Sequence, residues 1–407
     1  MQKIKLGIIG FGNIGCGTHT KNIWKGKCPE VELAAVADHD PARLEACREM
    51  CKEYRKEYPD NNISEPLLFE SAEAMMDAKV VDAVLVAVPH YDHPDLTIKA
   101  LERGLHVMCE KPAGVYTLQV REMMACADKH PDLVFGMMFN QRTNPVFRKM
   151  REIIQSGELG AIRRTNWLIT NWYRSQCYYD SGDWRATWSG EGGGVLLNQC
   201  PHNLDLWQWI CGMPKTVSAR LHFGKWHDIE VEDDVTAYVE YPNGATGVFI
   251  TSTGDTPGTN RFEILMERGK LVAVQEGKEG SLTMWKTEMS EPEFSATNTA
   301  PFAQPKAEKI EVETDGENPQ HIGVLNAFAA HILRGEPLVA DGREGINGLT
   351  ISNAMHLSAW TGKDVDLDHF DHALFREELM KRVATSRRKA PTANPGQVVD
   401  LEGTFGS

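Results

Sequence analysis

Along its first third, the chain alternates short apolar runs with stretches in which apolar residues recur every three to four positions. The short runs predict β-strands, and the amphipathic stretches predict helices. Strands are expected near 4–9, 32–37, 82–88, 105–109 and 133–138, and helices near 14–24, 41–57, 93–103 and 117–129. The run 84–88 is apolar throughout, as in a strand buried on both faces. The alternation therefore predicts a parallel sheet covered by helices.

After Asn140 the pattern changes, because apolar runs follow one another with few helical stretches between them. A helix is expected near 145–156, followed by strands near 161–171, 216–224, 235–241, 245–252, 260–266, 269–275 and 281–286. Consecutive strands of this kind indicate an α+β domain with a large, mostly antiparallel open sheet. Residues 287–319, rich in Glu, Pro, Thr and Ala, are expected to form a surface loop, with helices near 320–333 and 342–360 behind it.

Length, charge and cysteine content narrow the class of protein. At 407 residues the chain is too long for one compact core, which predicts domains over 1–140 and 141–370 and a C-terminal helix and tail over 371–407. The net charge of −14 argues against a nucleic-acid or anionic-membrane partner. No run has the length of a membrane span and no leader pattern is present, so we expect a cytoplasmic protein that binds small molecules. The nine cysteines form no C-x-x-C pair, which indicates reduced thiols and no metal site.

A glycine motif follows the first strand directly and opens the first helix. It comprises Gly10, Phe11, Gly12, Asn13, Ile14 and Gly15. In a G-x-G-x-x-G turn the first glycine allows the tight bend, the second lets the backbone approach a pyrophosphate, and the third lets helix and strand pack closely. The motif in this position predicts a Rossmann dinucleotide-binding domain.

Asp38 ends the second strand, where a carboxylate accepts the ribose hydroxyls of NAD and repels the 2′-phosphate of NADP. NAD is therefore expected and NADP is less favoured. Two features leave alternatives open. His39 and Arg43 could tolerate a phosphate, and Asp38 could serve only to begin the turn and cap the next helix.

Four further motifs complete the pattern. They are Glu110-Lys111-Pro112 after strand five, with Pro89 and His93 upstream; Asn140-Gln141-Arg142; Gly192-Gly193-Gly194 leading to Asn198, His202 and Asp205; and Gly342-Arg343-Glu344-Gly345. Together with the glycine turn, over about residues 3–367, the chain resembles the Gfo/Idh/MocA oxidoreductases, named after glucose-fructose oxidoreductase, inositol dehydrogenase and the rhizopine catabolism protein.

The resemblance implies an enzyme that oxidises a secondary hydroxyl of a sugar, cyclitol or glycoside by hydride transfer to NAD, with glycoside C3 as one candidate position. It implies that Lys111 accepts the hydroxyl proton and His202 assists. It also implies cofactor contacts from the glycine motif, Asp38, Pro89, His93, Glu110, Lys111, Gln141 and Arg142. A homodimer or homotetramer is expected, as in the family.

Asn198 departs from the family pattern, because many relatives carry an aspartate there. An amide can only form hydrogen bonds, so we expect Asn198 to orient the substrate and to leave Lys111 less stabilised as a cation. Asp205 lies on roughly the same helical face as His202 and could orient it or bind a sugar hydroxyl. Alternatively, Asp205 could only complement the helix N-terminus.

Residues 167–188 contain seven aromatic residues interleaved with charged ones. Aromatic faces beside polar groups suit carbohydrate rings, so substrate contacts are expected from Trp172, Tyr173, Trp184 and Arg185, with Lys111, Asn198, His202 and Asp205. A subunit interface is the alternative explanation for the aromatic residues. No basic cluster in the sequence indicates a phosphorylated or nucleotide-linked sugar.

Two other functions stay open. A tightly bound NAD could support transient oxidation in a redox-neutral elimination or glycoside cleavage, or the chain could be a non-catalytic NAD-responsive sensor.

Overall fold

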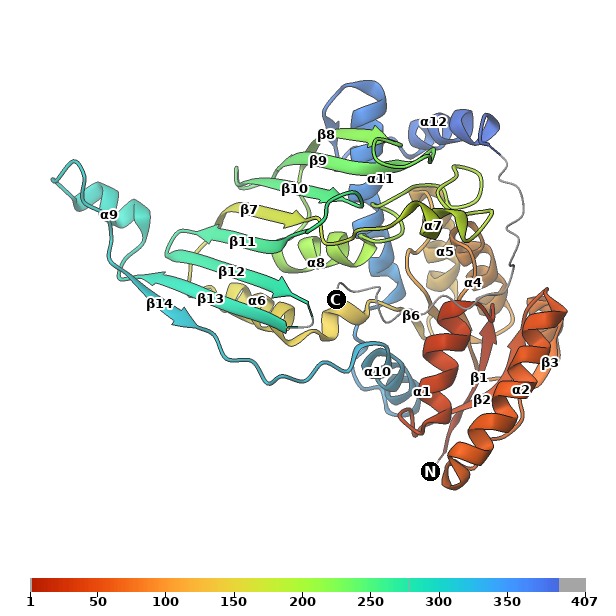
Figure 1. The fold of residues 1–407 in the computed structure, drawn as a ribbon. Coiled ribbons are helices and arrows are strands. Elements are labelled where there is room, and N and C mark those ends of the chain that lie inside the picture. Colours follow the sequence, from red (N-terminus) through yellow and green to blue (C-terminus); the bar gives the residue numbers. More distant parts are fainter. Residues whose placement is uncertain (1, 278, 388–407) are drawn as a thin grey trace.

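The computed structural model describes residues 2–277 and 279–387 and contains two sheets (Figure 1). The first sheet has the order β3-β2-β1-β4-β5-β6, and all its neighbouring strands are parallel. Its strands are β1 (Ile4–Ile9), β2 (Val31–Ala37), β3 (Leu67–Phe69), β4 (Ala83–Val86), β5 (His106–Cys109) and β6 (Phe135–Met137). The strand order reverses between β1 and β4, and a dinucleotide binds at such a switch point. The predicted Rossmann architecture is confirmed.

Short and long helices connect these strands. They are η1 (Gly15–Thr20), a π-helical turn that continues into α1 (Lys21–Trp24), then α2 (Pro41–Glu57), η2 (Pro59–Asn61), α3 (Ala72–Asp77), η3 (His90–Asp92), α4 (His93–Glu102) and α5 (Thr117–Lys129). Helix α2 spans the predicted residues, because Asp40 accepts a hydrogen bond from the Ala42 amide at 2.9 Å and Pro41 occupies the first helical position.

The second sheet has the order β14-β13-β12-β11-β7-β10-β9-β8-β15. Its strands are β7 (Ile162–Ile169), β8 (Thr216–Phe223), β9 (Glu232–Glu240), β10 (Thr246–Ser252), β11 (Asn260–Met266), β12 (Gly269–Glu276), β13 (Glu279–Thr287), β14 (Ala307–Glu311) and β15 (Val365–Asp366). Within this second sheet, among the described residues, only β7 and β10 pair in parallel. The expected large, mostly antiparallel sheet is therefore confirmed.

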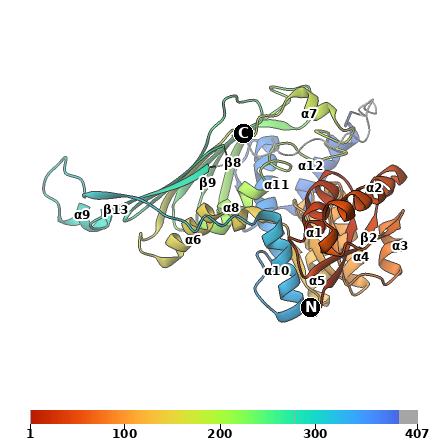
Figure 2. The ribbon, with the colours of Figure 1, turned by 60° about the horizontal axis from the view of Figure 1, so that its bottom comes forward.

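Helices cover one face of this sheet, and the described part of the chain places none on its other face (Figure 2). The elements of this half are η4 (Asn140–Thr143), α6 (Pro145–Ser156), α7 (Gln176–Asp180), α8 (Pro201–Cys211), η5 (Gly342–Glu344) and α11 (Gly345–Thr361). The strands alternate accordingly: Thr165 and Trp167 of β7 are buried, whereas Leu168 is exposed. Leu168, Tyr238 and Leu265 are large apolar or aromatic residues that the strands leave exposed.

Residues 287–319 are not the continuous loop that their composition suggested. They contain α9 (Glu291–Thr297), which begins with a capping box between Ser290 and Glu293, and the edge strand β14. The β14 sequence is largely charged and exposed, so it lacks the apolar alternation of a buried strand. Pairing with β13 determines its conformation.

One late helix returns to the first domain. Val324, Leu325 and Phe328 of α10 (Gln320–Arg334) share a core with Ile4, Leu6 and Ile8 of β1. The last helix, α12 (His372–Ala384), packs against α5 and α11. Most of the tail that we expected at the C-terminus, residues 388–407, lies outside the described residues. None of the described helices has the length and apolar content needed to cross a membrane.

Candidate active site

The three motif glycines occupy different environments at the end of β1. Gly10 has φ +93°, and a Cβ there would lie 2.3 Å from the Ala87 carbonyl oxygen. A Cβ on Gly15 would lie 2.2 Å from the Gly10 oxygen. On Gly12, by contrast, it would meet only an Arg43 nitrogen, at 3.8 Å. Gly10 and Gly15 therefore close the turn, while Gly12 leaves the space in which a pyrophosphate fits.

Asp38 lies beside this turn at the end of β2. Its Oδ2 accepts a hydrogen bond from the Phe11 amide at 2.7 Å and its Oδ1 accepts one from the Asp40 amide at 2.9 Å. Arg43, 46% exposed in its side chain, lies 3.4 Å from Asp38 Oδ2 and also pairs with Asp40. An ionised carboxylate has about four acceptor sites, so Asp38 can hold the turn and still accept ribose hydroxyls. Asn13 and Ile14, between Gly12 and Gly15, are half-buried.

Lys111 follows β5, and its Nζ donates to the Asn198 carbonyl oxygen at 3.2 Å. Burial lowers the pKa of Lys111, an effect that the carboxylates of Glu110 and Glu191 oppose and the charge of Arg174 assists. Lys111, at the end of a strand of the first sheet, thus forms a hydrogen bond with the backbone of the second domain. The Lys111–Pro112 peptide is cis.

Glu110 is buried and forms an ion pair with His19 of η1 at 2.7 Å. Burial by itself would raise the pKa of Glu110, but the hydrogen bond from His19 and the neighbouring His321 and Lys111 hold it at about 2. Burial lowers the pKa of His321, from α10, to about 4. Sequence reasoning missed both histidines, because they come from segments far from the Glu-Lys-Pro triplet.

His202 begins α8, and its Nδ1 is buried without a hydrogen-bond partner among the described residues. Burial, assisted by the charge of Lys111, lowers the pKa of His202 well below its usual value. The imidazole is therefore neutral at pH 7 and keeps an unsatisfied polar atom. A buried polar atom of this kind is a candidate ligand contact.

Asn198 has a carboxylate neighbour, Glu191, whereas the asparagine in the sequence suggested that no carboxylate acts at this position. Its amide nitrogen donates to Oε1 of buried Glu191, and its Oδ1 accepts from Gln199 at 3.2 Å. Glu191 Oε2 accepts from the Ala186 amide at 2.6 Å. Sequence reasoning missed Glu191, which stands directly before the three glycines.

A second buried carboxylate holds the loop that carries Asn198. Glu232 of β9 accepts hydrogen bonds from the amides of Gly194 at 2.9 Å and Leu196 at 3.0 Å. The His356 ring of α11 lies 2.9 Å from the same carboxylate. A Cβ on Gly194 would lie 2.0 Å from the Glu232 carbonyl oxygen, so only glycine permits this approach.

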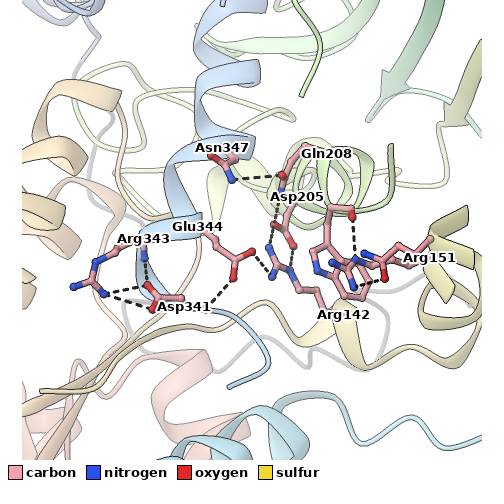
Figure 3. A network of polar contacts seen from close by, with 10 residues as sticks. Arg142, Arg151, Asp205, Gln208, Asp341, Arg343, Glu344 and Asn347 are labelled. Atoms are coloured by element: carbon pink, nitrogen blue, oxygen red, sulfur yellow. Dashed lines mark hydrogen bonds and ion pairs between the residues drawn. The ribbon is translucent and has the colours of Figure 1, made fainter. Parts of the chain in front are cut away.

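Arg142 and Asp205 form a buried ion pair (Figure 3). Arg142 Nε and Nη2 donate to the two Asp205 oxygens at 2.8 and 2.7 Å, and both side chains are 1% exposed. Glu344, half-exposed, accepts from Arg142 Nη1 at 2.8 Å. This geometry favours a role for Arg142 and Asp205 in holding η4, α8 and η5 together over direct contact with cofactor or substrate.

The remaining expected cofactor residues lie at the ends of the strands and at the domain junction. Both ring nitrogens of His93 face backbone carbonyls, Pro112 at 2.6 Å and Val88 at 2.8 Å, so this residue joins the ends of β4 and β5. Pro89 is exposed directly after β4, and Gln141 donates to Gln320 at 3.1 Å.

The aromatic segment reaches this cluster through Tyr178 and Trp184. Gln199 donates to the Tyr178 hydroxyl at 3.4 Å, and Arg185 donates to it at 2.8 Å. Trp184 packs edge-on against buried His90, with ring centroids 6.0 Å apart. Trp172 is buried, whereas Tyr173 is exposed. His90, whose Nδ1 lies 3.2 Å from the Glu191 carbonyl, is a further site neighbour that sequence reasoning missed.

Comparison with known proteins agrees with this geometry. The model of the oxidoreductase family with an NAD-binding Rossmann fold matches residues 4–137, and that of the GFO/IDH/MocA C-terminal domain matches residues 147–272. The chain belongs to the Gfo/Idh/MocA family. It is an oxidoreductase of a family of NAD(P)-dependent sugar and polyol dehydrogenases. The first sheet and its helices form the Rossmann domain of this family.

Two curated relatives align with this chain over nearly their whole length. D-xylose 1-dehydrogenase (NADP(+)) 2 of Haloferax volcanii is 27% identical over 89% of this chain and 99% of its own. D-glucoside 3-dehydrogenase of Escherichia coli is 26% identical over 89% of this chain and 97% of its own. The WlbA dehydrogenase of Chromobacterium violaceum, solved with NADH and UDP-GlcNAcA, superposes with a TM-score of 0.71 at 27% identity over 90% of this chain and 96% of its own.

Proposed function

We propose that this protein is an NAD-dependent dehydrogenase that oxidises a secondary hydroxyl of a sugar, cyclitol or glycoside. The observation that carries the proposal is the setting of Lys111: a desolvated amine at the end of β5 that donates to the Asn198 carbonyl at 3.2 Å. Its charge acts on His202, whose buried Nδ1 has no hydrogen-bond partner among the described residues. Relatives named for xylose and for position 3 of a glucoside support a sugar hydroxyl, and C3 of a glycoside as a candidate position.

A bound NAD would supply the acceptor for the hydride of the carbon that bears the hydroxyl. Lys111 in its neutral form accepts the hydroxyl proton, because its lowered pKa increases the population of free amine near neutral pH. The Asn198 carbonyl fixes the position of Nζ. Neutral His202 forms a hydrogen bond with the oxygen of the substrate hydroxyl. It does not act as an acid at pH 7, since its pKa lies well below the usual range.

The glycine turn and Asp38 would hold the cofactor. Gly12 leaves room for the pyrophosphate, and Asp38 accepts the ribose hydroxyls, with its charge opposed to a 2′-phosphate. Arg43 does not supply an unpaired charge for that phosphate, because it faces Asp38 and Asp40. This arrangement supports NAD over NADP, although one relative is named for NADP.

The test is a screen of sugars, cyclitols and glycosides for NADH formation by the full-length enzyme, repeated with Lys111→Met. We expect Lys111→Met to lower kcat/KM by about 10²–10⁴-fold, the usual contribution of a general base, with NADH affinity within a few-fold of the parent. Lys129→Met removes an exposed lysine at the end of α5 and should match the parent.

Two results would overturn the proposal. Turnover of a sugar without any accumulation of NADH would favour the redox-neutral alternative. Binding of NADH by the parent with no conversion of any member of the panel would favour the sensor.

A further inference from the structure

Two guanidinium groups meet at one phenol in the second domain. The Cζ of Arg185 lies 4.6 Å from the centre of the Tyr178 ring, and the Cζ of Arg174 lies 5.3 Å from it. Arg185 Nη1 donates to the Tyr178 hydroxyl at 2.8 Å, Arg174 also forms a hydrogen bond with it, and Gln199 approaches it at 3.4 Å. Arg174 Nη1 donates to the Tyr173 carbonyl at 2.8 Å. A hydroxyl accepts at most two hydrogen bonds, so the two arginines and Gln199 compete for the Tyr178 oxygen.

A short chain of contacts connects this donor cluster, defined as Arg174, Tyr178, Arg185 and Gln199, to the reacting lysine. Gln199 donates to the Asn198 side chain at 3.2 Å, and the Asn198 carbonyl accepts from Lys111 Nζ at 3.2 Å. The charge of Arg174 lowers the pKa of Lys111, which places the two cations within interaction range of each other. The donor cluster is therefore connected to Lys111 through Asn198 and Gln199.

Nearby carboxylates do not neutralise Arg185 by direct pairing. Among the described residues no carboxylate lies within ion-pair distance of its guanidinium, although Glu191 acts on it from farther away. Glu191 already accepts from Ala186 and Asn198. Asp180 is engaged by Gln176 at 3.0 Å. Both arginines and Tyr178 are half-buried, so solvent reaches them.

We propose that the donor cluster binds an oxyanion carried by the sugar substrate, so that the enzyme prefers an acidic or phosphorylated sugar to its neutral counterpart. Guanidinium groups match a carboxylate or phosphate with paired, charge-assisted hydrogen bonds, and partial desolvation strengthens them. This inference rests on the proposed function, because it assigns the substrate class of the same site.

The experiment measures binding to the NADH complex of the full-length enzyme, which cannot oxidise a sugar. D-glucose, D-glucuronate and D-glucose 6-phosphate are titrated by calorimetry, so that a carboxylate and a phosphate are compared with the neutral sugar. We expect at least one anion to bind about tenfold or more tightly than glucose, the gain that one charge-assisted hydrogen bond supplies.

Arg185→Gln should remove this preference, because a carboxylate or phosphate needs the guanidinium charge and a neutral hydroxyl does not. Arg220→Gln, which removes an exposed arginine on β8, is the matched control and should retain it. Equal affinities for all three sugars in the parent, or an anion preference that survives Arg185→Gln, would overturn the inference. Anion binding through Arg185 without NADH formation from any sugar would instead remove the proposed dehydrogenase function and leave the anion site standing.

Discussion

Replacing Asp205 by asparagine separates a supporting role for this residue from a substrate contact. The change leaves Arg142 with one carboxylate, Glu344, and sets an amide donor against a guanidinium donor in a region where both side chains are 1% exposed. Removing one partner of a buried ion pair costs about 3–5 kcal/mol. Because Glu344 stays at 2.8 Å, we expect the lower end, about 3 kcal/mol. Glu344→Gln should cost less than about 1 kcal/mol, since Glu344 is 38% exposed.

Urea unfolding followed by tryptophan fluorescence measures this loss, with kcat/KM recorded on the folded variant in the absence of urea. The double variant Arg142→Met with Asp205→Leu replaces both charges by apolar groups and should recover stability relative to Asp205→Asn, since it leaves no buried charge unpaired. A stability loss below about 1 kcal/mol together with a large fall in kcat/KM would refute the supporting role. Asp205 would then contact the substrate, which is one of the roles that its position on the helical face of His202 left open.

Three further predictions concern the cofactor, the proton and the assembly. Asp38→Ser should weaken NAD binding and narrow its margin over NADP in a fluorescence titration, because the carboxylate that opposes the 2′-phosphate is lost; an unchanged preference would reduce Asp38 to a turn residue. Asn198→Asp should move the acidic limb of the kcat/KM profile to higher pH, because a carboxylate raises the pKa of Lys111 and oxidation needs the neutral amine. We expect a shift of about half to one pH unit, since Glu191 would share a proton with the new carboxylate and so reduce its charge. An unmoved limb would contradict this. Leu265→Lys, on the open sheet face that also exposes Leu168, should dissociate a dimer or tetramer in sedimentation, and a parent protein that is monomeric at micromolar concentration would refute that assembly.

Sequence reasoning placed elements well where side-chain burial is regular. The helix over 41–57 and the strand over 4–9 match the predicted ranges, because local capping and continuous apolar character decide both. β3 and β14 were missed for the opposite reason. β3 has three residues at the edge of its sheet, and β14 is mostly charged, so their conformation depends on pairing with β2 and β13.

The same division applies to the site. The glycine turn and Glu110-Lys111-Pro112 are contiguous motifs, and a contiguous motif can be found in one dimension. His19 pairs with Glu110, Glu191 accepts from Asn198 and Glu232 accepts from Gly194, partners that lie 91, 7 and 38 residues away in the chain. A single sequence does not show that such residues lie in contact. For this reason the contact of Arg174 and Arg185 with the Tyr178 ring could not be predicted, although both arginines lie in the aromatic segment.

The proton affinity of Lys111 follows from all of these charges together. The asparagine at 198 suggested that no carboxylate stabilises the lysine as a cation, yet Glu110 and Glu191 both act in that direction. Each is already engaged, Glu110 by His19 and Glu191 by Ala186 and Asn198, so neither forms a direct ion pair with Nζ. Desolvation is the larger effect and the charge of Arg174 adds to it, so the pKa of Lys111 falls. The folded chain then binds fewer protons at this amine than the unfolded chain, and its contribution to stability becomes more favourable as the pH rises toward the unfolded value. Burial of the Lys111 amine thus lowers the free energy of unfolding below that pH. Such a loss of stability is expected where an ionisable group is desolvated to serve catalysis.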